Sequence, residues 1–146
     1  MPYDVRLADT MDALEGYRGS VLGLAQFRAS DRRLRALGEK MTESTFSRSS
    51  RLYLWRKKHF PNVSVSEALE VPCKRDVLEG AMLPMNPTDM QIVDTILLQT
   101  RCEVLFVGAV MQKTKDVELL NAGHEIIQSS GEDVSALLLL KKELGR

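Results

Sequence analysis

The sequence predicts an all-α protein, a single compact helical domain of about six to eight helices. Apolar residues recur at steps of three and four from Val5 to Met41, and no segment alternates polar and apolar residues convincingly as a strand would. The chain has 146 residues, of which 44% are hydrophobic and 27% charged, as in ordinary globular domains. We therefore treat residues 1–146 as one domain.

The N-terminal segment, from Met1 to Met41, is expected to form three helical stretches. The apolar periodicity that starts at Val5 is expected to break at Gly19–Ser20, because glycine is a poor helix former. It then resumes, and a third helix over 31–41 has Ser30 as its N-cap. No internal repeat is apparent in the sequence.

A turn is expected in the Ser- and Thr-rich stretch 42–50, because these side chains compete for backbone hydrogen bonds. The segment 51–60 favours a helix, since it lacks β-branched residues, and Pro61 ends it. Two short helices are expected next, before Pro72 and over 73–82.

The clearest helix start lies near Asn86, a natural N-cap followed by Pro87 at the first helical position. This helix is expected to reach about Thr100. The apolar run Val104–Met111 is ambiguous: it suits a short buried strand or a buried helix, and we favour helix because no other strand is available to pair with it. Thr114 and then Ser130 are expected to begin the last two helices.

Charge is distributed unevenly along the chain, although the net charge is zero. Between Arg28 and Lys58 there are ten basic and three acidic residues, whereas the second half is acidic. Such asymmetry is typical of a protein that binds an anionic partner. The alternative is that the two halves attract each other, within one fold or across an oligomer.

The two cysteines are expected to be reduced, unbridged and packed in the core. Cys73, Cys102, His59 and His124 are too far apart in sequence for a zinc motif, so no metal and no cofactor are predicted. The N-terminal residues do not look like a secretory signal, and the longest apolar run is too short to span a membrane. We expect a cytoplasmic protein that does not enter membranes.

No catalytic motif stands out. There is no Gly-x-Ser-x-Gly, no Walker-type loop and no Gly-x-Gly-x-x-Gly, and only two histidines are available as bases near neutral pH. We therefore expect that the protein is not an enzyme.

The segment Ser47–Lys58 resembles the recognition helix of bacterial helix-turn-helix DNA-binding proteins, including transposase-associated ones. The resemblance rests on small polar residues followed by Leu-Tyr-Leu-Trp-Arg-Lys-Lys. It implies that Leu52 and Trp55 face the core, that the serines and Arg51 face bases, and that the trailing cations contact phosphates. The nucleic-acid-binding residues implied are Arg48, Ser49, Ser50, Arg51, Arg56, Lys57 and Lys58.

The last helix carries four consecutive leucines, which cover more than one helix face. Either the helix is buried in the centre of the domain, or one face contacts another chain; we favour the second, in a homo-oligomer or a complex. The expected interface residues are Leu137, Leu140 and Leu144.

These observations favour a small DNA-binding regulatory protein that uses the basic helix Arg48–Lys58. The alternative is a non-enzymatic protein-interaction module, an adaptor or inhibitor, that docks its basic and aromatic face on an acidic protein partner. Arginine, tryptophan and tyrosine fit this alternative equally well, because they are enriched at binding hot spots.

Overall fold

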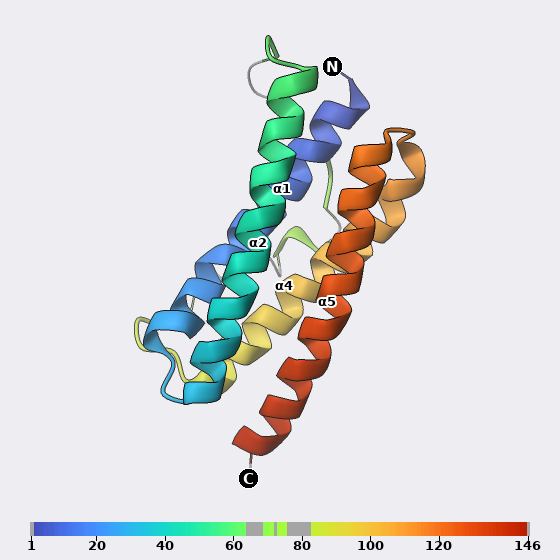
Figure 1. Cartoon of the computed structure of the whole chain (residues 1–146). Helices are drawn as coiled ribbons and strands as arrows, with labels where there is room; N and C mark the ends of the chain where they lie inside the picture. The colour runs from blue at the N-terminus through green and yellow to red at the C-terminus, as the bar shows by residue number, and fades with distance from the viewer. Residues whose placement is uncertain (1, 64–68, 72, 76–82, 146) are drawn as a thin grey trace.

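The computed structural model describes residues 2–63, 69–71, 73–75 and 83–145. Four long α-helices lie side by side as a bundle (Figure 1). The all-helical class is confirmed, but the described residues form four α-helices, where six to eight helices were expected. No described helix is apolar over a length that would cross a membrane. The elements are α1 (Tyr3–Arg28), α2 (Arg32–His59), α4 (Asp89–Val110), the 3-10 helix η2 (Met111–Lys113) and α5 (Val117–Leu144).

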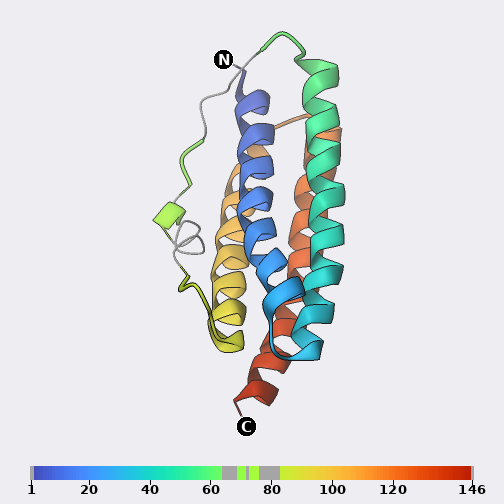
Figure 2. The same cartoon turned by 90° about the vertical axis from the view of Figure 1, so that its left-hand side faces the viewer.

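The bundle consists of two antiparallel hairpins, α1 with α2 and α4 with α5. Within each hairpin a short connection joins the helices, whereas the connection from α2 to α4 returns along the length of the bundle (Figure 2). As a result α1 lies antiparallel to α4, and α2 lies antiparallel to α5. The α2–α5 pair has the less extensive contact of these two.

The helices are longer than expected because residues that look like breaks lie inside them. Gly19–Ser20 is within α1, and the whole stretch 42–50 is within α2, so the predicted turn was wrong. The hydroxyls of Thr42 and Ser44 donate to the carbonyl oxygens of the residues four positions earlier, and so leave the helical backbone bonds in place.

In the second half of the chain, too, residues that look like helix ends or starts lie inside helices. The helix α4 continues past Thr100 to Val110, so Val104–Met111 is helical as favoured and the strand alternative is not formed. Ser130 lies in the middle of α5 and begins no new helix. The two short helices expected before Pro72 and over 73–82 fall largely outside the described residues.

Helix starts differ from the predictions by one or two residues. The observed N-caps are Asp31, Thr88 and Asp116, each accepting a hydrogen bond from a backbone amide of the first turn. They replace the expected caps Ser30, Asn86 and Thr114. Thr88 also forms a capping box with Gln91.

An internal repeat relates the two hairpins, contrary to the sequence-based expectation. The helices α2 and α5 have equal lengths and match residue for residue. The distance in sequence from Arg32 to Val117, their first residues, equals that from His59 to Leu144, their last residues. Their caps Asp31 and Asp116 keep this offset. Identical residues recur at it: Pro2/Pro87, Asp4/Asp89, Asp9/Asp94, Thr10/Thr95, Gly23/Gly108, Asp31/Asp116, Leu34/Leu119, Gly38/Gly123, Ser44/Ser129, Ser50/Ser135, Leu52/Leu137, Leu54/Leu139 and Lys57/Lys142.

The repeat also organises the hydrophobic core, which has two clusters. One contains Leu7, Leu52 and Phe106, and the other holds their repeat counterparts Ile92, Leu137 and Val21. The chain therefore buries equivalent apolar faces at the two ends of one bundle.

The leucines expected at an oligomer interface belong mostly to this core. Leu137 and Leu140 are buried within the chain, and Leu144 packs against the same cluster. The exposed leucines of α5 are Leu138 and Leu139 instead. The prediction placed the wrong leucines on the outside of the helix, because a run of four leucines does not reveal which of them face the core.

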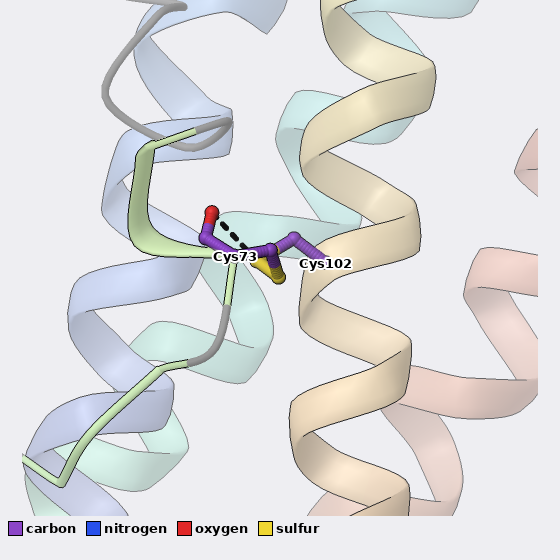
Figure 3. Close-up of a disulfide and its surroundings, with 2 residues drawn as sticks. All are labelled: Cys73 and Cys102. Atoms are coloured by element: carbon purple, nitrogen blue, oxygen red, sulfur yellow. Dashed lines mark hydrogen bonds between the residues drawn. A yellow bond between two sulfur atoms is a disulfide. The ribbon is translucent and has the colours of Figure 1, made fainter.

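Cys73 and Cys102 form a disulfide between the long connection and α4 (Figure 3), so the prediction of unbridged thiols was wrong. They are 29 residues apart in sequence, but the connection returns beside α4 and brings their Cα atoms to 5.6 Å. This proximity depends on the tertiary path of the connection and leaves no trace in local spacing.

Candidate functional site

The seven residues implied to contact nucleic acid lie on different sides of α2. Arg48 points inward and is only 3% exposed, and its guanidinium is bonded to the Glu15 carboxylate on α1. Ser49 donates to Asp12, and Arg56 to Asp9, so both face α1. The structure therefore does not bring the seven residues together on one surface, because α2 is packed along its length against other helices.

The remaining cations lie on the exposed side of α2. Arg51 is exposed and pairs with Glu125 of α5 at 2.5 Å, and Lys58 lies 4.0 Å from Glu118. Lys57 lies over the ring of Tyr53, 5.4 Å from its centroid. Ser50 is partly exposed.

Between these cations α2 exposes large apolar side chains. Phe46 is 73% exposed, Tyr53 52% and Leu54 64%. Phe46, Ser50, Tyr53 and Lys57 are spaced by four, three and four residues, so they follow one line along the helix. We call Phe46, Ser50, Tyr53, Leu54 and Lys57 the α2 outer face.

Leu52 and Trp55 are buried in the core, as the resemblance implied. The Trp55 indole donates to the Asp116 carboxylate at 3.2 Å, and Asp116 also caps α5. The rings of His59 and Phe60 pack against Trp55. Trp55 therefore fixes the end of α2 against the start of α5.

A layer of charged side chains crosses the middle of the bundle, between the two apolar clusters. We call Glu15, Arg18, Arg48, Glu103 and Asp133 the central polar layer. Arg18 of α1 lies 3.5 Å from Glu103 of α4 and 3.4 Å from Asp133 of α5. Arg18 and Glu103 are counterparts in the internal repeat, as are Arg48 and Asp133, so the layer lies where the two hairpins meet.

Burial dominates the electrostatics of this layer. Glu103 is 0% exposed, and burial followed by repulsion from Glu15 raises its pKa to about 8. Burial opposes the charge of Arg48, but the hydrogen bond and charge of Glu15 outweigh it, so the pKa of Arg48 is raised. At neutral pH the layer therefore combines two guanidinium groups with a protonated Glu103.

Several buried atoms of the layer and its neighbours have no hydrogen-bond partner among the described residues. They include both carboxyl oxygens of Glu103, the Nε of Arg18 and the hydroxyls of Thr100 and Ser130. Because Glu103 does not reach the surface, it is not placed to act on a substrate from solution. The layer is a titratable element of the core.

A hollow of about 360 Å³ opens between α2 and α5, where these helices are less closely packed. We call it the α2–α5 hollow. Its walls are mainly apolar, and five ionisable groups line it. The lining residues are Arg48, Arg51, Leu52, Leu54, Trp55, Lys58, Glu118, Leu119, Asn121, Ala122 and Glu125.

Sequence reasoning missed Glu15, Arg18, Glu103 and Asp133. No motif or helix signal pointed to the first three, and Asp133 lies inside α5, where a separate helix was expected to start at Ser130. Two signals could have found them. Arg18 stands between apolar positions on the buried side of α1, and the repeat aligns it with Glu103.

No protein-family model matches this chain, and no curated protein matches it. Among solved structures, CopM in the Cu(II)-bound form superposes with a TM-score of 0.79, and the alignment covers 99% of each chain. Sequence identity is 13%, so the likeness concerns the fold.

Proposed function

We propose that the protein is a non-enzymatic interaction module that binds an acidic, amphipathic segment of a partner protein on the α2 outer face. The observation that carries this proposal is the exposure of Phe46, Tyr53 and Leu54 beside cationic side chains. Exposed aromatic side chains next to arginine or lysine are typical of binding hot spots.

The α2 outer face is rigid and already formed. It belongs to a helix of 28 residues whose other sides are fixed by Asp9, Asp12 and Glu15 of α1. Binding of a partner therefore does not require this surface to become ordered, and the smaller entropy cost favours affinity. Arg51, Lys57 and Lys58 give the surroundings a positive charge that complements carboxylates of the partner.

A labelled amphipathic helical peptide, with leucines on one face and glutamates around them, tests the proposal by fluorescence anisotropy. We expect the double variant Phe46→Ala with Tyr53→Ala to weaken binding about tenfold or more, because two hot-spot side chains together contribute over about 1.4 kcal/mol. The matched control is Leu98→Ala with Leu105→Ala, which removes two exposed leucines of α4. Equal loss in both double variants, or no binding by the wild type, would contradict the proposal.

DNA binding is the second candidate, and the exposed Arg51, Lys57 and Lys58 favour it. Duplex DNA in place of the peptide separates the two. If these cations contact phosphates, the double variant Lys57→Ala with Lys58→Ala reduces the slope of log affinity against log salt by about 0.9 per lost contact. The Phe46 and Tyr53 variants then leave DNA binding unchanged.

The disulfide bears on where the interaction takes place. Disulfides persist in oxidising compartments and are rare in the reducing cytoplasm. A cytoplasmic protein was expected to have reduced thiols, whereas Cys73 and Cys102 form a disulfide. We therefore place the proposed interaction in an oxidising compartment.

Copper, which CopM binds, is not part of the proposal for this chain. Within the described ranges no group of three or more His, Cys, Asp and Glu side chains is arranged to hold a metal ion. Both thiols are used in the disulfide, and thiolates are the form in which cysteine binds metals.

A further inference from the structure

The α2–α5 hollow has the size and lining of a small-molecule site. Its volume of about 360 Å³ lies within the range of ligand pockets, which often occur between the helices of bundles. Leu52, Trp55, Leu119 and Ala122 supply apolar walls from both helices. All four belong to the packed core or contact it, so the walls are held in place.

A buried cation lies at the inner end of the hollow. The Arg48 guanidinium is fixed by Glu15, and its Nη1 donates to Ser129 at 3.0 Å. A guanidinium has five N–H donors, and the bonds of Arg48 to Glu15, Thr45 and Ser129 leave its Nη1 with capacity for a further acceptor.

Two more cations stand at the rim, Arg51 and Lys58. Each is paired with a carboxylate of α5, but these pairs are solvent-exposed. Exposed ion pairs contribute little to stability, so an anionic ligand can replace the Glu125 carboxylate at Arg51 with little loss.

The internal repeat gives the other end of the bundle a different arrangement of charges. The counterparts of Arg48, Arg51 and Lys58 are Asp133, Ala136 and Glu143. At the equivalent position, α5 therefore has acidic and neutral residues in place of three cations, whereas α2 has Arg33 and Lys40 in place of Glu118 and Glu125. The two hairpins share a fold but differ in charge here.

We propose that the α2–α5 hollow binds a small anionic amphiphile, with an apolar acyl or aromatic body against Trp55 and Leu119 and a carboxylate head at Arg51 and Arg48. The hollow shares Leu54 with the α2 outer face, but Phe46 and Tyr53 do not line it, so variants at those two positions separate this inference from the proposed function.

Octanoate is the probe, with 1-octanol and octyltrimethylammonium as neutral and cationic counterparts of the same chain length. Trp55 is the only tryptophan, so its fluorescence reports occupancy directly, and calorimetry gives the stoichiometry. We expect saturable binding of one octanoate per chain. Octanol and the cation should bind at least about fivefold more weakly, since neither can pair with a guanidinium.

Two variants test the location. Ala122→Phe fills the hollow from within, and Asn121→Phe obstructs it from the exposed rim, where a change threatens folding less. Each should weaken octanoate binding about tenfold, equivalent to about 1.4 kcal/mol. Ala109→Phe, on the exposed side of α4, is the matched control and should bind as wild type does.

The proposal is overturned if wild type shows no saturable signal with octanoate, or if octanol binds as tightly. It is also overturned if folded Asn121→Phe retains wild-type affinity. The double variant Phe46→Ala with Tyr53→Ala should keep octanoate binding while losing the acidic peptide, and loss of both ligands would contradict the assignment to the hollow. The two proposals can therefore fail separately.

Discussion

Glu103 shows how burial changes the chemistry of one residue. Its carboxyl group lies in the central polar layer between two apolar clusters, and its nearest cation, Arg18, is 3.5 Å away and shared with Glu15 and Asp133. Burial raises the pKa of Glu103 to about 8, against an ordinary value of 4.5, with Glu15 adding to the effect. An uncharged carboxyl group is the form that the dry interior favours.

The variant Glu103→Gln should therefore alter the pH dependence of stability. Because the pKa is higher in the folded protein, Glu103 takes up a proton on folding between pH 4.5 and about 8. Its favourable contribution is complete below pH 4.5 and is lost as the pH rises through about 8. We expect the wild-type free energy of unfolding to fall relative to the variant by up to about 1.4 kcal/mol per pH unit over this range.

Urea unfolding at pH 5, 6.5 and 8 measures this difference. Glu39→Gln is the control, since Glu39 is exposed on α2 and lies outside the central polar layer. The free energy of unfolding of this control should change with pH in the same way as that of the wild type. If the free energy of unfolding of Glu103→Gln also changes with pH as that of the wild type does, the Glu103 carboxyl group is charged from pH 5 to pH 8. The account of the central polar layer given above would then be wrong.

At the scale of the elements, one glycine in each hairpin sets how closely the helices approach. A Cβ atom at Gly38 would lie 2.7 Å from the backbone nitrogen of Gln26 and 2.9 Å from the Cβ of Ala25, both on α1. Its repeat counterpart Gly123 would place a Cβ against Met111, the counterpart of Gln26. Glycine in these two helices therefore serves packing, although it lowers helix propensity.

Gly38→Ala should destabilise the protein by about 1–3 kcal/mol, because the added methyl group forces α1 and α2 apart. Gly16→Ala is the matched control on α1, where a Cβ atom meets nothing within 4 Å. There the same substitution should stabilise the protein by roughly 0.5–1 kcal/mol through helix propensity. Thermal melting followed by circular dichroism gives both values, and a stabilising Gly38→Ala would refute the close approach.

At the scale of the molecule, the fold is two similar helical hairpins joined by one long connection. The repeat gives each end of the bundle its own apolar cluster and places the charged counterparts Arg18 and Glu103 together in the middle. The connection from α2 to α4 must return along the bundle, and the disulfide fastens it to α4 (Figure 3).

Intact mass under non-reducing conditions should be about 2 Da below the mass of the dithiol form, since closing a disulfide removes two hydrogens. Reduction, or the double variant Cys73→Ser with Cys102→Ser, should lower the free energy of unfolding by about 3–4 kcal/mol, the value expected from chain entropy for a loop of 29 residues. Helix content should change little. A mass that matches two thiols would refute the bridge.

The sequence by itself determined the all-helical class and the end of α2 before Pro61, because apolar periodicity and terminal signals act over a few residues. The burial of Leu52 and Trp55 was implied by the resemblance of Ser47–Lys58 to a recognition helix. The repeat is also present in the sequence, but it was missed because helix breaks were expected at glycine and serine residues that lie inside α1 and α2. Only the tertiary structure decided that Arg48 turns inward to Glu15, that Leu137 and Leu140 are core, and that Cys73 meets Cys102. These outcomes depend on which helix lies opposite each side chain, and that is set by packing between segments far apart in the chain.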